Sequence, residues 1–521
     1  MIKRLPTLDL SIILIYLAAM LLVGFYFSRK NKSFEQFTSA SGKIPGWAIG
    51  MSIYATFLSS NTFLGVPGKT FGSNWNVYVF SLSMPFAAWF AAKYFVPFYR
   101  NTGEISAYTH FEKRFGPWAR TYAVVCFLLT QIARMGSIFF GIALSLQALT
   151  RFDMKTIMLV MGISIIIYTV LGGIEAVIWT EVVQAVIKTF GAFLIVYLII
   201  TDMPGGINQI VQVGKAAHKF SLGSFQPDFT RPTFWVIFLY GFFINLNNFG
   251  VDQNYVQRYH TASSTAAAKR SIWICVAMYI PASLLFCIIG SCLYAYYAIH
   301  PEFIETIKQQ VAIERSGAGA SVATIVKTAA SLKPEDYGDK VMPHFMVNKI
   351  PVGLVGLIVS AILSAAMSTI SSGMNSSATV FTADIYSRYF KKSVNEKQTM
   401  RILHIATLVF GLTGMLAGIA MIGIKSVLDV WWQLSGIFAT GMLGLFLMGI
   451  ISRQTRNHEA IIATVIGVLV VIWMTVPSLI PIQYASIRST LNINMIIVVG
   501  TLSIFLTGVL LTKITIPKAV G

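Results

Sequence analysis

Long apolar runs, separated by short polar and basic connections, occupy most of the chain. An apolar run of roughly 20 residues is long enough to cross a bilayer as a helix. The pattern predicts an all-α integral membrane protein, a single polytopic domain over residues 1–521, with about thirteen transmembrane helices. These lie at residues 8–28, 46–71, 77–99, 118–149, 155–172, 174–201, 232–257, 268–299, 351–386, 399–423, 428–452, 458–477 and 491–512.

Polar residues interrupt the second apolar run, in the segment 54–68, YATFLSSNTFLGVPG. A helix in hydrocarbon keeps its backbone polar groups bonded within itself, and this segment favours a break in that ladder. A break leaves carbonyl groups without partners at the end of the first half-helix, where the helix dipole is negative. Secondary transporters place ion and substrate sites at such broken helices. The alternative is an ordinary span whose Ser and Thr side chains pack against another helix.

A second interruption lies at residues 245–252, NLNNFGVD, five predicted spans after the first. This spacing is the one that two inverted repeats of five helices produce. Asp252 falls toward the predicted cytoplasmic end of its run, where a structural role is expected.

Composition and charge agree with a membrane protein. Hydrophobic residues make up 55% of the chain and charged residues 11%, against roughly 25% charged residues in soluble domains, and the mean hydropathy is +0.70. The net charge of +19 comes from basic residues in short connections. This pattern is typical of cytoplasmic loops, places the N-terminus outside and the C-terminus in the cytoplasm, and argues against nucleic-acid binding. The first run ends in Arg29-Lys30-Asn31-Lys32 without a cleavage site, which predicts a retained span.

Two charged residues lie within apolar runs, where they are costly and usually functional. Arg134 can pair bidentately with a substrate carboxylate, or form a structural ion pair with Glu181 or another acid. Glu181 can bind a cation or carry a proton, or belong to a gate or packing ion pair.

A stripe of small and hydroxyl side chains follows one helix face in residues 361–379, AILSAAMSTISSGMNSSAT. Ala365, Ser368, Thr369 and Ser372 have the spacing of one face, and Ser371 lies beside them. Their oxygens, with the carbonyls of a broken helix, can surround a desolvated sodium ion. The alternative is close packing against another helix.

Three stretches in this order resemble the sodium:solute symporter family, which includes sodium-coupled galactose, proline and sialic acid carriers: AAMSTISSGMNSSATVFTADIY at 365–386, GGIEAVIWTEV at 172–182, and DQNYVQRY at 252–259. The resemblance implies a five-plus-five inverted repeat, the LeuT-type fold. The repeats would span about 46–201 and 232–452, with flanking helices at 8–28, 458–477 and 491–512.

The resemblance also implies binding residues. The main sodium site would use the carbonyls of Ala55, Leu58 and Ala365 and the hydroxyls of Ser368 and Thr369. A possible second sodium site would use Glu181, Ser368, Ser371 and Ser372, although the family has Asp at position 181. The substrate would contact Ser59, Ser60, Thr62, Arg134 and Asn245. The chain departs from sialic acid carriers at Phe80-Ser81-Leu82, which lacks their glutamine, and has Asn248 where sugar carriers have an aromatic gate.

These observations predict a sodium-coupled symporter that imports an acidic sugar, with sialic acid (N-acetylneuraminic acid) preferred, by alternating access. We expect it to work as a monomer in a bacterial cytoplasmic (inner) membrane. The alternative within transport is a neutral sugar, polyol or monocarboxylate. A membrane enzyme is disfavoured because the seven histidines are scattered without paired spacing, and a substrate sensor would normally carry a soluble output domain.

Overall fold

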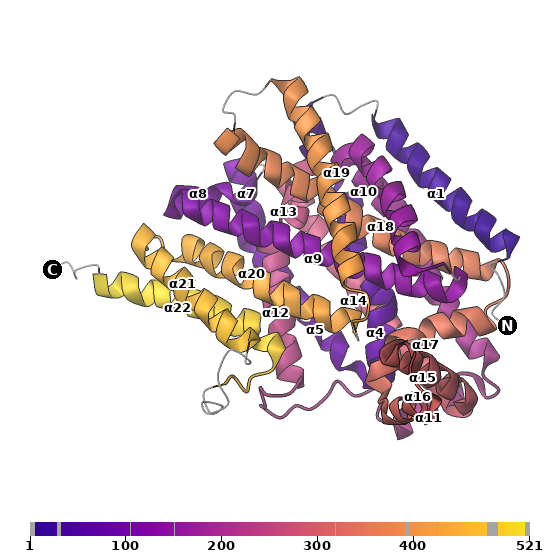
Figure 1. Ribbon diagram of the computed structural model, residues 1–521. Coiled ribbons are helices and arrows are strands. Elements are labelled where there is room, and N and C mark those ends of the chain that lie inside the picture. Colours follow the sequence, from indigo (N-terminus) through magenta and orange to yellow (C-terminus); the bar gives the residue numbers. More distant parts are fainter. Residues whose placement is uncertain are drawn as a thin grey trace.

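The computed structural model describes residues 6–28, 33–104, 106–150, 152–317, 319–390, 395–424, 426–476 and 488–515. Over these residues the chain is helical, with a single isolated bridge between Ile44 and Ala262, which confirms the all-α prediction (Figure 1). The longer helices are α1 (Thr7–Ser28), α3 (Gly46–Phe57), α4 (Ser60–Gly72), α9 (Pro117–Thr150), α10 (Met154–Asp202), α11 (Gly206–Ala216), α12 (Phe234–Gly250), α13 (Gln253–Thr261), α14 (Thr265–Ile299), α15 (Pro301–Ser316), α16 (Val322–Ser331), α17 (Pro334–Lys349), α18 (Leu354–Val380), α19 (Glu396–Ala420), α20 (Val427–Ile451), α21 (Asn457–Thr475) and α22 (Ile496–Thr515). Shorter helices include α2 (Phe34–Ser39), α5 (Val79–Leu82), α6 (Met84–Phe90), α7 (Val96–Thr102) and α8 (Thr109–Phe115).

The predicted spans fall on helices, but their number stays a prediction. Among the described residues, ten helices are long and apolar enough to cross a membrane, and the bent pair α12–α13 makes an eleventh. The predicted spans 46–71 and 155–172 correspond to the short pair α3–α4 and to the first half of α10. Gly173 separates the halves of α10 with a left-handed backbone (φ +59°, ψ −169°), which glycine adopts without steric cost. Residues 29–32, 391–394, 425 and 477 of the predicted loops and spans lie outside the described residues.

Both predicted interruptions are present as broken helices. α3 ends at Phe57 and α4 begins at Ser60, with Leu58 (φ −87°, ψ 85°) and Ser59 (φ −95°, ψ 177°) in non-helical conformations. α12 and α13 meet at 46°. Asp252 begins α13, because its carboxylate accepts a hydrogen bond of 2.8 Å from the amide of Asn254, which is an N-cap contact.

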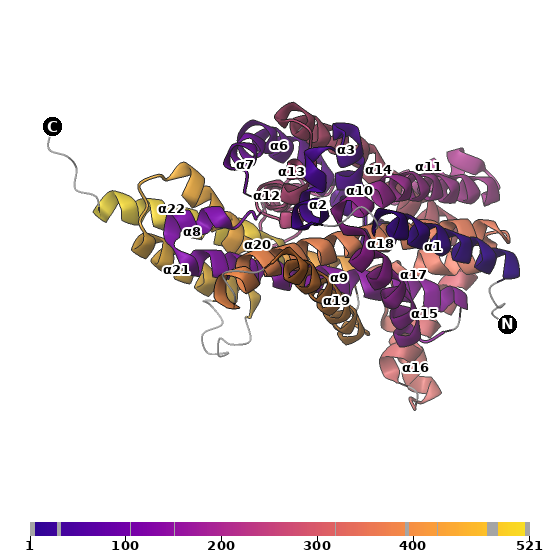
Figure 2. The ribbon, with the colours of Figure 1, turned by 90° about the horizontal axis from the view of Figure 1, so that it is seen from above.

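Helix α18 forms the centre of the bundle and carries the hydroxyl stripe. Every residue from 358 to 380 is buried, and α18 contacts α1, α3, α9, α10 and α13. The buried Asp9 of α1 accepts hydrogen bonds from the amides of Gly353 and Gly356 at its N-terminal end (2.8 and 2.6 Å). In Figures 1 and 2, α1 lies at one edge of the molecule and α21 and α22 lie at the opposite edge.

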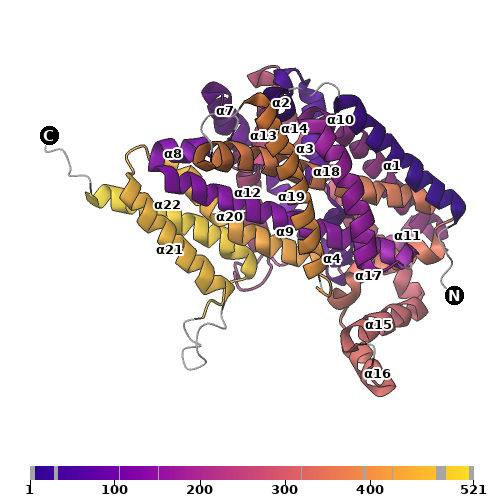
Figure 3. The ribbon, with the colours of Figure 1, turned by 45° about the horizontal axis from the view of Figure 1, so that its top comes forward.

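The helices of two segments, residues 206–216 and 301–349, gather on one side of the bundle. Figure 3 shows α11, α15, α16 and α17 together there, with α16 projecting away. α17 packs closely on α4, where a Cβ added at Gly338 would lie 2.4 Å from the carbonyl oxygen of Gly68. The cap formed by these helices is therefore joined directly to the second half of the first broken helix.

Candidate functional site

A small cavity of about 70 Å³ lies beside the first break. Three of the predicted substrate residues, Ser59, Thr62 and Arg134, line it. The other walls come from four further parts of the chain, and include Phe80 and Ser81, Tyr240 and Asn248, Tyr279 and Ser283, and Leu428, Trp431 and Trp432. The cavity thus lies where the sequence placed the substrate.

The guanidinium of Arg134 is buried at the wall of this cavity. Its Nη2 donates to the carbonyl oxygen of Thr56 and to the hydroxyl of Tyr255, both at 3.1 Å. Its Nη1 lies 3.8 Å from a carboxylate oxygen of Asp252, which is beyond hydrogen-bond distance. The ring of Trp431 lies 5.6 Å from the guanidinium carbon. A guanidinium carries five N–H donors in a fixed fork, and the two short bonds of Arg134 use only part of that capacity.

Two other predicted substrate residues turn away from the cavity in this conformation. Ser60 donates to the carbonyl oxygen of Ile138 at 3.2 Å, and Asn245 donates to the hydroxyl of Ser83 at 3.4 Å. Asn61, which the sequence analysis did not single out, lines the cavity and donates to the hydroxyl of Ser137 at 2.9 Å.

Aromatic side chains close around this space. The ring of Trp432 stacks on Phe80 at 5.6 Å and contacts Tyr240 at 5.0 Å. The hydroxyl of Tyr240 donates to the carbonyl oxygen of Trp432 at 3.0 Å. Ligand pockets usually measure roughly 300–1,000 Å³, so this conformation is a closed one, and the cavity must widen to admit a ligand of ordinary size.

The predicted main sodium site is assembled, and a lysine ammonium lies at its centre. Lys188 of α10 donates to the carbonyl oxygens of Ala55 and Leu58 at 2.6 and 2.9 Å and to the hydroxyl of Ser368 at 3.0 Å. Ser368 also donates to the carbonyl oxygens of Ala55 and Ala365, both at 3.1 Å. Thr369 donates to the carbonyl oxygen of Thr56 at 3.2 Å. The five predicted ligands therefore come together from α3, from the break that follows it and from α18.

The predicted second sodium site also contains a side-chain cation. Glu181 is fully buried and pairs with Arg258 of α13, whose Nη2 lies 2.8 and 3.0 Å from its two carboxylate oxygens. Ser372 donates to Glu181 at 2.6 Å. Ser371 instead donates to the carbonyl oxygen of Ser368 at 3.2 Å. The acid that the sequence offered as a partner for Arg134 is thus engaged by a different arginine.

Sequence reasoning missed Lys188 and Arg258. Lys188 follows Glu181 by seven residues, about two helical turns, inside an apolar run. Its position carries the same signal that identified Arg134, a basic residue at membrane depth. Arg258 directly follows the predicted span 232–257, among polar neighbours, and yet it is one of the largest fully buried side chains.

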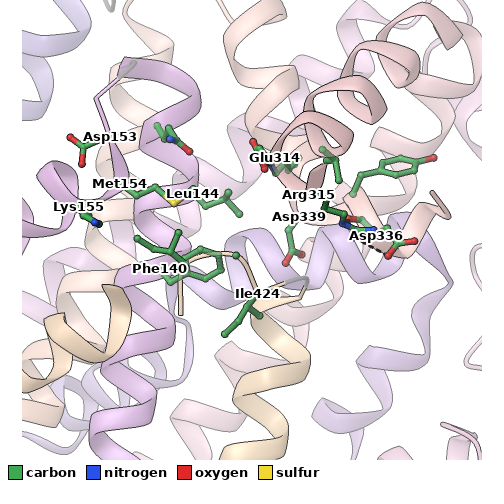
Figure 4. A pocket seen from close by; sticks show the side chains of 16 residues that line it. Phe140, Leu144, Asp153, Met154, Lys155, Glu314, Arg315, Asp336, Asp339 and Ile424 are labelled. Carbon is green, nitrogen blue, oxygen red and sulfur yellow. Dashed lines mark hydrogen bonds and ion pairs between the residues drawn. The ribbon is translucent and has the colours of Figure 1, made fainter. Parts of the chain in front are cut away.

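A larger cavity, about 790 Å³, lies toward the cap of α11, α15, α16 and α17, between the start of α10, the α19–α20 connection, α15 and α17 (Figure 4). Four of its charged residues form two pairs: Arg315 bonds Asp336 at 2.9 Å, and Lys340 contacts Glu314. Asp339 accepts a hydrogen bond of 3.1 Å from the amide of Val427, next to the cavity-lining Leu428. Burial raises the pKa of Asp339 from 3.8 to about 6.

Comparisons with known proteins agree with this geometry. The sequence profile described as "Sodium:solute symporter family" matches residues 37–467. The sodium/sialic acid symporter NanT of Aliivibrio fischeri is 32% identical over 97% of this chain and 92% of its own length. The sodium/sialic acid symporter SiaT of Proteus mirabilis is 31% identical over 96% and 94%. A solved structure, described as the substrate-bound outward-open state of a Na⁺-coupled sialic acid symporter, superposes with a TM-score of 0.84, 30% identity and 98% coverage of both chains.

Proposed function

This chain belongs to the sodium:solute symporter family, and we propose that it imports an acidic sugar, with sialic acid (N-acetylneuraminic acid) as the preferred substrate. It is a transporter of the bilayer and not an enzyme. The proposed cycle is alternating access, in which the aromatic closure around the central cavity opens to one side and then to the other.

The position of Arg134 is the observation that supports an acidic substrate. Its guanidinium lines the cavity and is only 8% exposed. A carboxylate accepts two parallel hydrogen bonds from such a fork, and these bonds are strong where water is excluded. The relatives named as sodium/sialic acid symporters support the same choice.

The remaining substrate contacts follow the cavity wall. Ser59 and Thr62 supply hydroxyl groups from the first break, in reach of a ligand beside Arg134. Ser60 and Asn245 are proposed to join them once the cavity widens, which requires both to leave their present hydrogen bonds. The segment Phe80-Ser81-Leu82 lacks the glutamine that sialic acid carriers have there, and in this conformation its Ser81 donates to Ser283 at 2.6 Å.

Sodium is the proposed coupling ion, and its support comes from the family and the relatives. The main site keeps its proposed ligands Ala55, Leu58, Ala365, Ser368 and Thr369, but as they lie here they surround the Lys188 ammonium and leave no place for a second cation. The proposed second site, with Glu181, Ser368, Ser371 and Ser372, is closed by the Arg258 guanidinium. Sodium coupling therefore requires one of these cations to move.

The protein is a multi-pass membrane transporter, and its bacterial relatives indicate the inner membrane. We further propose that the N-terminus faces outward, that the C-terminus is cytoplasmic, and that a single chain performs transport. The orientation is supported by the basic residues of the predicted cytoplasmic connections.

The decisive experiment is uptake into proteoliposomes. Labelled N-acetylneuraminic acid is compared with neutral sugars, polyols and monocarboxylates, under sodium, lithium, choline and proton gradients. We expect concentrative uptake of the acidic sugar with a sodium gradient. Preferred uptake of a neutral sugar or polyol, with no competition by sugar acids, would replace the proposed substrate.

A further inference from the structure

The ammonium group of Lys188 lies between the end of the first half-helix, α3, and the stripe of small and hydroxyl residues on α18. Lys188 is fully buried, with 0% of its surface exposed. It comes from α10, and its partners are two carbonyl oxygens at the end of the first half-helix and one hydroxyl of α18. An ammonium has three N–H donors and no acceptor, so these three contacts satisfy all of its hydrogen-bonding capacity.

The partners of Lys188 are those that an interrupted helix offers to a cation. The last carbonyls of a helix carry the negative end of its dipole and have no intrahelical donor. At this break, the Lys188 contacts to Ala55 and Leu58 take the place of the missing amide groups. Burying an isolated charge is costly unless it is paired and hydrogen-bonded. This site gives one positive charge three hydrogen bonds and the negative end of a helix dipole, without a carboxylate among its partners.

A second cation at the same oxygens is excluded by geometry and by charge. The nearest described acid on the same helix is Glu181, and Arg258 pairs with it at 2.8 Å. No carboxylate is among the oxygens that bond Lys188. Two positive charges sharing neutral ligands would repel each other strongly in a medium of low dielectric constant.

We propose that Lys188 is the resident cation of the main site and excludes sodium from it while its ammonium is bound there. A sodium ion in the main site would link the first break to α18. In this protein the side chain of Lys188 makes that link instead. A group tethered to the protein acts at a high effective concentration, so free sodium competes poorly with it. This proposal rests on the assignment of the main site within the proposed function, and it does not depend on the identity of the substrate.

The test measures sodium binding without any substrate. The thermal unfolding midpoint of the purified protein in detergent is followed in sodium chloride and in choline chloride of equal ionic strength. For the unmodified protein we expect no sodium-specific shift of the midpoint that depends on the main-site residue Thr369, so sodium bound elsewhere should stabilise the unmodified protein and Thr369→Ala equally. Lys188→Met and Lys188→Ala should each acquire a sodium-specific stabilisation, with a half-effect at a sodium concentration at least about tenfold lower than any sodium effect on the unmodified protein.

Chemical replacement of the side chain gives a second readout. Ethylammonium chloride should stabilise Lys188→Ala, whose shortened side chain leaves space for a small alkylammonium ion, and should leave the unmodified protein unchanged. A purely structural role for Lys188 would produce the same loss of stability in every salt.

Lys219→Met is the matched control. Lys219 is also buried and donates to two carbonyl oxygens at a helix end, those of Phe71 and Ser73 at 2.7 and 2.9 Å, but it lies after α11, away from the break. It should lose stability without gaining any sodium response. Identical salt responses of the Lys188 and Lys219 variants would overturn the proposal.

If the Lys188 variants do not fold in any salt, the unfolding midpoints of the unmodified protein test the proposal. Equal midpoints in sodium and choline would then support the proposal. A sodium-specific stabilisation of the unmodified protein that disappears in Thr369→Ala would place sodium in the main site beside Lys188 and would refute it. Failure of the substrate assignment leaves all of these measurements unchanged, because no sugar is present.

Discussion

Three buried basic side chains lie close to the first break, and each has a different set of partners. Arg134 lines the cavity, Lys188 bonds the carbonyls of the broken helix, and Arg258 pairs with Glu181. Buried charges of this kind persist only with partners. At the scale of single residues, the chemistry of the site therefore depends on which oxygen atoms bind each of these three cationic side chains.

Replacing Arg134 by lysine should weaken acidic substrates while keeping the positive charge. Lysine lacks the planar two-pronged donor that matches a carboxylate. Losing one charge-assisted hydrogen bond costs about 1.5–3 kcal/mol, or roughly ten- to a hundredfold in apparent affinity. The measurement is competition of labelled sialic acid uptake by the acid and by an analogue whose carboxylate is a neutral amide.

The matched control for this substitution is Arg114→Lys. Arg114 bonds only backbone carbonyls among the contacts that the structure shows for it, those of Gly449, Ser452 and Arg453, so uptake affinity should be unchanged. Equal competition by the acid and its amide in the unmodified protein would show that Arg134 does not bind a carboxylate, and the neutral-sugar alternative would take its place.

Glu181→Gln should destabilise the protein strongly. The substitution leaves the Arg258 guanidinium, 1% exposed, without its counter-charge, and breaking a buried pair in this way costs about 3–5 kcal/mol. The double variant Glu181→Gln with Arg258→Gln should lose less stability than the sum of the two single variants. The measurement is a double-mutant cycle: the thermal unfolding midpoints of the unmodified protein, the two single variants and the double variant are compared in detergent.

Sodium titration of the same variants separates the ion pair from a second sodium site. If Glu181 also binds sodium during the cycle, the Hill coefficient for sodium-driven uptake should fall toward one in Glu181→Gln. A coefficient of one in the unmodified protein limits coupling to a single sodium ion, at the main site or at the second site. Additive losses in the double variant would instead show that Glu181 and Arg258 do not interact.

At the scale of elements, the outer helix α17 connects two halves of the transport core. It packs on α4 through Gly68 and Gly338, and its Asp339 accepts a hydrogen bond from the first residue of α20, Val427. α4 carries Thr62 and α20 carries Trp432, which both line the cavity. Movement of α17 is therefore coupled to the walls of the substrate site.

Asp339→Asn should change how the stability of this junction depends on pH. The pKa of Asp339 in the folded protein is about 6, above its ordinary value of 3.8, so the folded state holds the proton more tightly than the unfolded state. The stabilisation from the protonated form is present at low pH and is lost as the pH rises through this window. Asparagine stays neutral and should avoid the loss.

The expected difference is modest because Asp339 is only partly buried. A two-unit shift corresponds to at most about 3 kcal/mol, and partial exposure reduces this to the order of 1 kcal/mol. Unfolding midpoints between about pH 4.5 and pH 7.5 measure it. Parallel pH curves for the two proteins would contradict the role of Asp339.

At the scale of the whole molecule, we predict that the cap of α11, α15, α16 and α17 faces outward and that the basic connections face the cytoplasm. Val322 of α16 is 77% exposed and lies in the projecting part of the cap (Figure 3), whereas the exposed Glu396 begins α19 after a predicted cytoplasmic connection. These two positions report the orientation of the chain.

Cysteine labelling in intact cells tests this orientation. A membrane-impermeant maleimide should label Val322→Cys from outside, and should label Glu396→Cys only after the cells are permeabilised. The native cysteines give little background, because three are buried and Cys126 is partly buried within the span α9. The reverse pattern would invert the proposed topology.

Much of the fold was predictable from the sequence because the bilayer imposes simple rules. Apolar runs must become helices, since no water satisfies their backbone groups, and the runs indeed fall on helices. The interruptions at 54–68 and 245–252 became breaks for the same reason, because their Gly, Asn and Ser residues weaken the helical ladder. The stripe of Ser368, Thr369 and Ser372 was likewise readable from its spacing.

The partners of the buried charges were decided only by the tertiary structure. Periodicity shows which face a residue occupies along its own helix, but it does not show which residue of another helix lies opposite. Arg258 and Glu181 are 77 residues apart, and Lys188 meets Ser368 across 180 residues. The sequence by itself determined the membrane fold, the broken helices and the family. The packing of α10, α13 and α18 around the first break determined that a lysine, and not an open cavity, lies among the oxygens of the main site.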